Sequence, residues 1–253
     1  MSSGAELEFL APDAATAFDG AEPAPRSAIE WTHRDAGAEL GERAGWRVVS
    51  TYGEPEAEAA ACRDAVGVAD LCFLGKLELQ GSATLVAEVV AGLAGGAALG
   101  PGRAALHDEV WWCPVTPEKV LAVTPPERTA GLRDEIDRAV SADDRFASVI
   151  ELTTALGSNA VVGPLAREAF ARATALDLRP ERFEPGSFAP VSVARTSGMV
   201  LRERDDDFLH LFGAGFAAYV WTVFVDAVEH LGGRAVGTEA LAASRFGGGS
   251  PDA

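Results

Sequence analysis

The chain has 253 residues, enough to bury one large hydrophobic core or two small ones. Its formal net charge of -17 argues against nucleic acid and against an anionic membrane surface as partners. The 3 cysteines are scattered and the 4 histidines lack metal-ligand spacing, which argues against a disulfide framework and a metal site. We see no signal peptide and no apolar stretch of about 20 residues, so we expect a cytoplasmic protein.

Both ends of the chain have the composition of unstructured segments. Residues 1–25 are rich in Ala, Pro, Asp and Glu, which predicts a flexible N-terminal arm. Residues 241–253 end in GGGSPDA, which predicts a flexible C-terminal tail. Between them we expect a first folded unit over 26–145 and a second over 146–240.

Hydrophobic periodicity and turn residues predict alternating helices and strands in the first unit. Helices are expected at 27–43, from Pro55 to about Val66, at 83–94 and from 125 to about Val140, and strands at 76–80, 110–115 and 120–124. The last of these helices follows a predicted capping box of Thr124 and Glu127.

The second unit repeats this order of elements. The sequence predicts a strand at 159–163, a helix at 164–176, a hairpin from GMVLRER and FLHLF, and a helix at 214–231. In each unit a strand ends on a glycine just before a helix, at Gly81 and at Gly163, where the missing side chain permits close approach. We therefore predict an α+β fold of duplicated strand–helix–hairpin–helix units; the alternative is coincidence between two ordinary α+β segments.

Several segments resemble the glycine-cleavage T-protein (aminomethyltransferase) superfamily. The matching segments are 33–46 with Tyr52 (H…GA…AGW…Y), 59–81 with Asp70, Gly75 and Lys76 in place, the hairpin segment 107–128, and VVGPLA at 161–166. The resemblance implies the folate-binding domains of that family, whose first two are similar α+β units. We expect the family's C-terminal β-barrel to be missing, because the chain ends before it.

The resemblance also implies an activity, the transfer of a one-carbon unit between a small-molecule amine and tetrahydrofolate. The family's adjacent acid pair matches Asp108 and Glu109, so Glu109 would be the catalytic group, with Asp108 beside it. Arg195 would bind a folate carboxylate, and Glu203 would substitute for the pterin-binding Glu. Trp111 would line the folate pocket between the two units. The alternatives are a solvated strand entrance for the acid pair, a surface position on a strand for Arg195 and packing for Trp111.

Departures from the family motifs support a second hypothesis. Glu109 stands where the family has an Asp, and an added methylene displaces the carboxylate by roughly 1.5 Å, enough to slow a reaction. Cys72-Phe73 replaces a Ser-His pair, and the G-Y-T-G-E segment expected after Thr196 is not in register. The stretch 176–221 is similar to the gamma subunit of heterotetrameric sarcosine oxidase. This resemblance implies a non-catalytic accessory subunit beside a larger flavin-dependent oxidase subunit, so whether the chain is an enzyme stays open.

Overall fold

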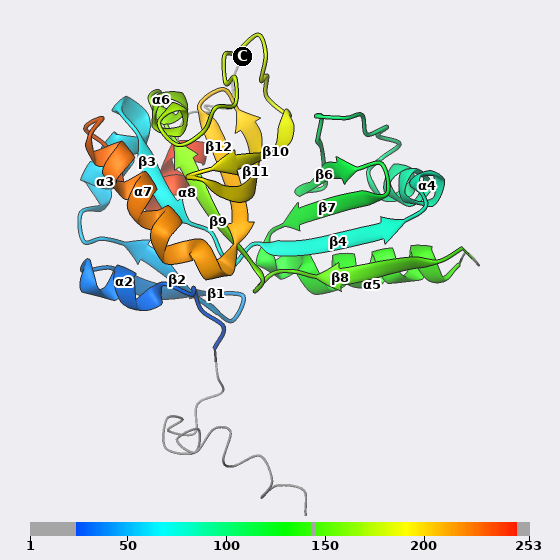
Figure 1. Cartoon of the computed structure of the whole chain (residues 1–253). Coiled ribbons are helices and arrows are strands. Elements are labelled where there is room, and N and C mark those ends of the chain that lie inside the picture. The colour runs from blue at the N-terminus through cyan, green and yellow to red at the C-terminus, as the bar shows by residue number, and fades with distance from the viewer. Residues whose placement is uncertain (1–23, 143–144, 247–253) are drawn as a thin grey trace, which may run out of the picture.

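The computed structural model describes residues 24–142 and 145–246 (Figure 1). The helices are α2 (Glu30–Asp35), α3 (Pro55–Asp64), α4 (Ala83–Leu93), α5 (Thr129–Ser141), α6 (Ala166–Ala171), α7 (Ala217–Glu229) and α8 (Thr238–Phe246), with 3-10 turns η2 (Pro126–Arg128) and η3 (Ala214–Phe216). The strands are β1 (Glu39–Arg43), β2 (Trp46–Thr51), β3 (Gly67–Asp70), β4 (Gly75–Gly81), β5 (Ala105–His107), β6 (Val110–Thr116), β7 (Lys119–Thr124), β8 (Ala147–Glu151), β9 (Leu156–Val162), β10 (Phe188–Val193), β11 (Thr196–Arg204), β12 (Asp207–Gly213) and β13 (Arg234–Ala235).

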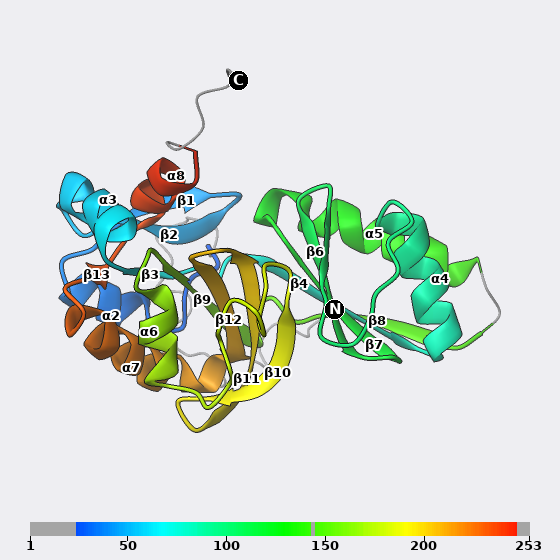
Figure 2. The same ribbon diagram turned by 90° about the horizontal axis from the view of Figure 1, so that it is seen from above.

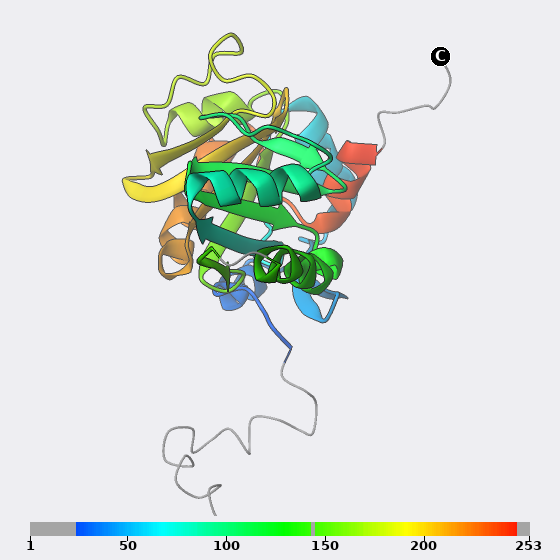
Figure 3. The same cartoon turned by 90° about the vertical axis from the view of Figure 1, so that its right-hand side faces the viewer.

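Two larger sheets lie side by side and form the body of the molecule (Figures 1 and 2). One has six strands in the order β10-β11-β12-β9-β3-β13, and the other has five in the order β5-β6-β7-β4-β8. Figure 3 shows α4 and α5 covering the face of the five-stranded sheet that is turned away from the other sheet. Among the described helices, none is long and apolar enough to cross a membrane.

The two sheets repeat one pattern, and the predicted α+β fold of duplicated units is confirmed. The order β5-β6-β7-β4 in one sheet matches β10-β11-β12-β9 in the other. In the chain, α4 follows β4 and α5 follows β7, just as α6 follows β9 and α7 follows β12. A shared sheet order together with a shared helix order is not expected of two unrelated segments.

Each unit contributes one strand to the sheet of the other. β3 precedes β4 in the chain but pairs antiparallel with β9, and β8 precedes β9 but pairs antiparallel with β4. Sheet pairing therefore crosses the expected division at 145/146 in both directions. This exchange makes the two crossing segments, 71–74 and 152–155, neighbours at the junction of the two sheets.

Three apolar clusters form the core. One lies between the six-stranded sheet and α6 and α7, and another between the five-stranded sheet and α4 and α5. The third fills the space between the two sheets and extends to α3 and α8. Its members include Phe73, Leu121, Phe188, Leu201 and Leu209.

The glycine that ends β9 is required by its surroundings. Gly163 has φ of +120°, and a Cβ there would lie 2.7 Å from the backbone oxygens of Cys62 and Ala65. The equivalent Gly81 is less constrained, because an added Cβ would meet the Ala147 side chain at 3.2 Å. The predicted approach of the following helix is thus seen at Gly81, where Leu85 of α4 would lie 3.6 Å from the added Cβ, but not at Gly163, which is crowded by the end of α3 and the residues after it.

The predicted helix at 27–43 is wrong beyond residue 35. Only Glu30–Asp35 is helical, and Gly37, with φ of 83°, is followed by the β1–β2 hairpin. Ala44 and Gly45 form its two-residue turn, both at positive φ. The chain reverses there because Gly45 readily adopts the left-handed conformation that such turns need.

Four further boundaries differ from the sequence-based prediction. The capping box does not form: the buried Thr124 hydroxyl has no hydrogen-bond partner among the residues that the structure describes, and α5 begins at Thr129 after η2. α6 ends at Ala171, well short of the predicted 176, and α7 ends at Glu229, close to the predicted 231. α8 extends over 241–246, the first residues of the expected C-terminal tail. The remaining tail residues and residues 1–23 of the expected arm lie outside the described part.

Candidate functional site

The predicted acid pair forms a hairpin turn. Asp108 and Glu109 are the two central residues between β5 and β6, since His107 pairs with Val110. Their φ angles are 47° and 61°, the left-handed values of a type I′ turn. Both side chains are exposed, and Asp108 forms an ion pair of 3.1 Å with Arg128.

Arg195 occupies the equivalent turn of the second unit. Ala194 and Arg195, with φ of 49° and 60°, lie between β10 and β11, and Arg195 is exposed. Arg103 and Ser187, which lie just before β5 and β10, form an antiparallel bridge. The two strands therefore run in opposite directions from this bridge, so the structure places Arg195 and the acid pair at opposite ends of the paired segments.

Trp111 and Glu203 both lie on strand faces that are turned toward the apolar cluster between the two sheets. Trp111 is half-buried on β6 and packs against the apolar cluster between the two sheets. The buried Cys113, two residues further along β6, has a thiol pKa raised by burial and by the nearby Glu203 carboxylate. Glu203, half-buried on β11, therefore faces the same region as Trp111. Trp112 points the other way and is buried beneath the helices of the first unit, as strand alternation requires.

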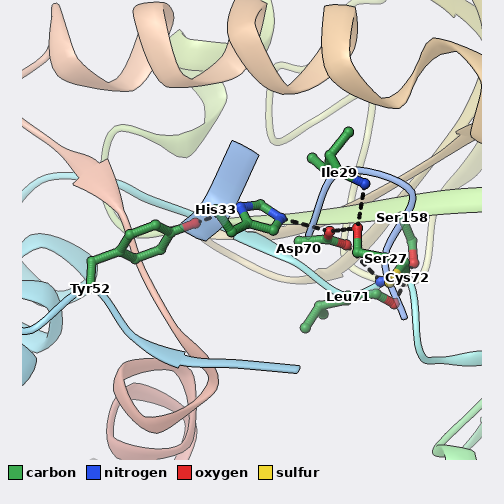
Figure 4. A network of polar contacts seen from close by, with 8 residues as sticks. All are labelled: Ser27, Ile29, His33, Tyr52, Asp70, Leu71, Cys72 and Ser158. Carbon is green, nitrogen blue, oxygen red and sulfur yellow. Dashed lines mark hydrogen bonds and ion pairs between the residues drawn. The ribbon is translucent and has the colours of Figure 1, made fainter. Parts of the chain in front are cut away.

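A buried polar network lies instead at the end of β3 (Figure 4). His33 Nε2 lies 2.9 Å from Asp70 Oδ2, and the Tyr52 hydroxyl lies 2.9 Å from His33 Nδ1. The Ser27 hydroxyl donates to Asp70 Oδ2, and the backbone N–H of Cys72 donates to Asp70 Oδ1 at 2.8 Å. Asp70 therefore has hydrogen-bond partners in α2, in the segment before α2 and at the end of its own strand, β3.

The hydrogen bonds decide the ionisation of Asp70. Burial alone would raise the pKa of this carboxyl, but hydrogen bonds from His33, Ser27 and Cys72 hold it below its usual value. Asp70 is therefore an ionised carboxylate, which only accepts, so Nε2 of His33 is the donor. Burial, with the charge of Asp70 added, raises the pKa of Tyr52, which keeps its hydroxyl protonated.

Lys76 holds the crossing segment between β3 and β4. Its side chain is fully buried, and its Nζ donates to the carbonyls of Cys72 at 2.8 Å and Leu74 at 2.9 Å. Burial lowers the pKa of Lys76 to about 8. Gly75 beside it leaves no room for a side chain, because a Cβ would lie 2.0 Å from the Thr129 hydroxyl.

The network uses residues that sequence reasoning had treated only as markers of the resemblance. His33, Tyr52, Asp70 and Lys76 were recognised in the matching segments, but no role was predicted for them. The sequence did carry a signal for this network: His, Asp and Lys occur in segments that form the core, and such side chains are rarely buried unless they pair. Their partners come from four separate segments, which a reading of local patterns does not connect. Within the described part, no group of three or more His, Cys, Asp or Glu side chains could hold a metal ion.

The protein is thus of the α+β class, with two units that exchange strands and meet near the buried His33, Asp70 and Lys76 side chains. The family model described as the GCVT N-terminal domain matches residues 29–252. The chain belongs to this family. No curated protein sequence matches it.

Two solved structures share this fold. The glycine cleavage system aminomethyltransferase T from Bartonella henselae superposes with a TM-score of 0.72 at 18% identity, over 88% of this chain and 62% of that one. This chain therefore spans about three-fifths of that protein. A chain of the heterotetrameric sarcosine oxidase from Corynebacterium sp. U-96, solved with pyrrole 2-carboxylate, superposes with a TM-score of 0.59 at 18% identity, over 71% of this chain and 93% of that one. At this identity the likeness concerns the fold alone.

Proposed function

We propose that the chain is a non-catalytic accessory subunit that acts beside a larger amine-oxidising subunit. The observation that carries this proposal is the position of Glu109, exposed in a hairpin turn. A general acid or base must lie within hydrogen-bond reach of its substrate, usually in a pocket that excludes water. The similarity to a chain of a heterotetrameric sarcosine oxidase, 93% of which is covered, supports the same role.

Tetrahydrofolate, which the family implies, does not fit the predicted residues as a group. Arg195 and Glu109 lie at opposite ends of the paired segments, and both side chains are exposed. Arg128 is already paired with Asp108, so an anionic cofactor could bind Arg128 only by breaking this ion pair. We therefore derive no reaction step through folate at Glu109.

The accessory role is tested by reconstitution. The chain is expressed alone and together with candidate amine oxidase subunits, and assembly is measured by size-exclusion chromatography with light scattering. Oxidation of sarcosine is then measured with and without the chain. We expect a defined complex whose oxidase activity or stability depends on the chain but not on Glu109. A monomer that neither associates nor alters the oxidase contradicts the proposal.

A folate-binding transferase is the second candidate, and one observation favours it. Trp111 and Glu203 face the same region, so an aromatic ring and a carboxylate are available to a flat heterocycle with ring N–H groups. Calorimetry with tetrahydrofolate tests it, using Trp111→Leu and Glu203→Gln, with Arg195→Gln as the matched control on the distant turn. This candidate is supported if Trp111→Leu and Glu203→Gln lose binding while Arg195→Gln keeps it. It is eliminated if the wild-type chain does not bind tetrahydrofolate.

A further inference from the structure

A small cavity of about 110 Å³ adjoins the buried network at one end of the six-stranded sheet. Asp70, Asn159, Ala214 and Ala217 contribute to its wall, and Arg26 lies in the same lining. A water molecule occupies about 30 Å³ of liquid, so the cavity has room for three or four waters, or for a molecule of about five heavy atoms. This space belongs neither to the acid pair nor to the Trp111–Glu203 region.

Asn159 supplies a buried donor without a partner. The residue is 1% exposed, and its Nδ2 makes no hydrogen bond within the described part of the chain. The register of β9 pairs Asn159 with Asp70 on one side and with His210 on the other, so all three share one face of the sheet. A buried amide without a partner is costly, and it is normally retained where a water or ligand completes it.

Asp70 supplies a negative charge beside this donor. Its carboxylate accepts from Ser27, His33 and the Cys72 amide, yet its side chain keeps 6% of its surface exposed. A carboxylate has about four acceptor sites, so one remains for a further donor. This remaining site suits an ammonium group.

Another part of the cavity wall favours negative charge. Ala214 and Ala217 belong to η3 and to the first turn of α7, a helix of 13 residues whose N-terminus has no side-chain cap. The positive end of the helix dipole favours an anion there. The guanidinium of Arg26, an exposed residue of the same lining, adds positive charge.

We propose that this cavity binds a small α-amino acid as its zwitterion. The ammonium group would donate to Asp70, and the carboxylate would accept from Asn159 Nδ2 near the N-terminal end of α7. Five heavy atoms, as in glycine, match the volume, and a bulky side chain does not fit. The site is independent of the accessory role and of folate binding.

The sequence offers a direct spectroscopic test. Asn159 is the only asparagine and Gln80 the only glutamine of the chain, so a ¹⁵N-labelled sample has one side-chain NH₂ pair from each. Gln80 lies on β4 in the other sheet and hydrogen-bonds to Glu78, which makes it an internal control. Glycine, methylamine and acetate are titrated separately into the millimolar range. We expect glycine to shift the Asn159 signals saturably, to leave those of Gln80 unchanged, and to bind more tightly than either half-molecule.

Variants complete the test. Asn159→Ala removes a donor that has no protein partner, so the variant should fold at least as stably as the wild type. Loss of a hydrogen bond to a charged group should weaken glycine binding about 10- to 100-fold, measured by calorimetry. An Asn159 signal that does not respond to glycine identifies a water-filled cavity and overturns the proposal. Acetate binding as tightly as glycine also overturns it, because the site would then recognise an anion alone.

Discussion

His210 should make the stability of the protein depend on pH in a way that one substitution removes. Its imidazole is fully buried on β12, and neither ring nitrogen has a hydrogen-bond partner among the described residues. Burial lowers the pKa of His210 to about 3, against an ordinary value of 6.5. The rings of Phe170, Phe212 and Phe224, with centroids 6.1, 4.9 and 5.5 Å away, account for this apolar environment.

The sign and size of the effect follow from proton linkage. Below pH 6.5 His210 binds a proton in the unfolded chain but not in the folded protein. Its contribution to stability is therefore fully present above this pH, and the free energy of unfolding falls as the pH is lowered. The loss amounts to about 1.4 kcal/mol per pH unit between pH 6 and pH 3. Between pH 7 and pH 5, His210 alone should lower the free energy of unfolding by about 2 kcal/mol.

Urea unfolding at pH 5, 6 and 7 measures this loss in the wild type and in His210→Phe. The variant should lose about 2 kcal/mol less over the range, whatever its stability at pH 7. Phe188→Leu, a change at another buried aromatic residue, is the matched control, and it should shift stability equally at each pH. Equal pH dependence in the wild type and in His210→Phe would refute the argument, because the imidazole would then be protonated or hydrated inside the fold.

Three further substitutions test the site and the fold. Glu109→Ala and Glu109→Asp should each change the free energy of unfolding by less than about 0.5 kcal/mol and leave any oxidase complex active; a loss of activity would restore Glu109 as a catalytic group. Gly163→Ala should destabilise by more than about 2 kcal/mol in urea unfolding, whereas Gly92→Ala, in an uncrowded turn of α4, should stabilise slightly; equal effects would contradict the crowding seen at residue 163. Asp70→Asn should cost about 3 kcal/mol at pH 7 and remove part of the acid sensitivity below pH 4, because the lowered pKa of Asp70 stabilises the folded state only while the group is ionised; an unchanged acid transition would show that Asp70 is already neutral.

The sequence could predict those elements whose signals are local. Pro55 marks the start of α3, and the strands of the β6–β7 hairpin came from their β-branched and aromatic residues. The β1–β2 hairpin was missed because ELGER in β1 is polar and largely exposed, so it carries no alternation, while Ile29, His33 and Leu40 happen to match a helical period.

The candidate site was harder to predict than the fold. The acid pair was expected at the entrance of the strand over 110–115, and the β5–β6 hairpin whose turn it forms was not predicted. Its exposure depends on which strands cover it, and this is decided by sheet order. Arg195 was assigned to the same site because both segments carried family motifs. The antiparallel bridge of Arg103 with Ser187 separates them, and no local pattern indicates that bridge.

The strand exchange gives residues 70–76, which match the family motif, a structural role, although the predicted catalytic turn is exposed. β3 ends at Asp70 in one sheet and β4 begins at Gly75 in the other, so residues 71–74 must cross between sheets. Lys76 binds the carbonyls of this crossing, and its own N–H donates to the Thr153 hydroxyl of the reciprocal crossing at 3.2 Å.

Each of these residues thus performs a structural task that a different side chain would perform poorly. An apolar side chain at residue 76 would leave the partly buried carbonyls of Cys72 and Leu74 without this donor, and any side chain at residue 75 would collide with Thr129. Selection for the exchanged sheets alone can therefore keep the D…GK motif. In this chain the motif has a structural role and does not by itself indicate catalysis, which has to be judged at the hairpin turn, where the chain departs from the family pattern.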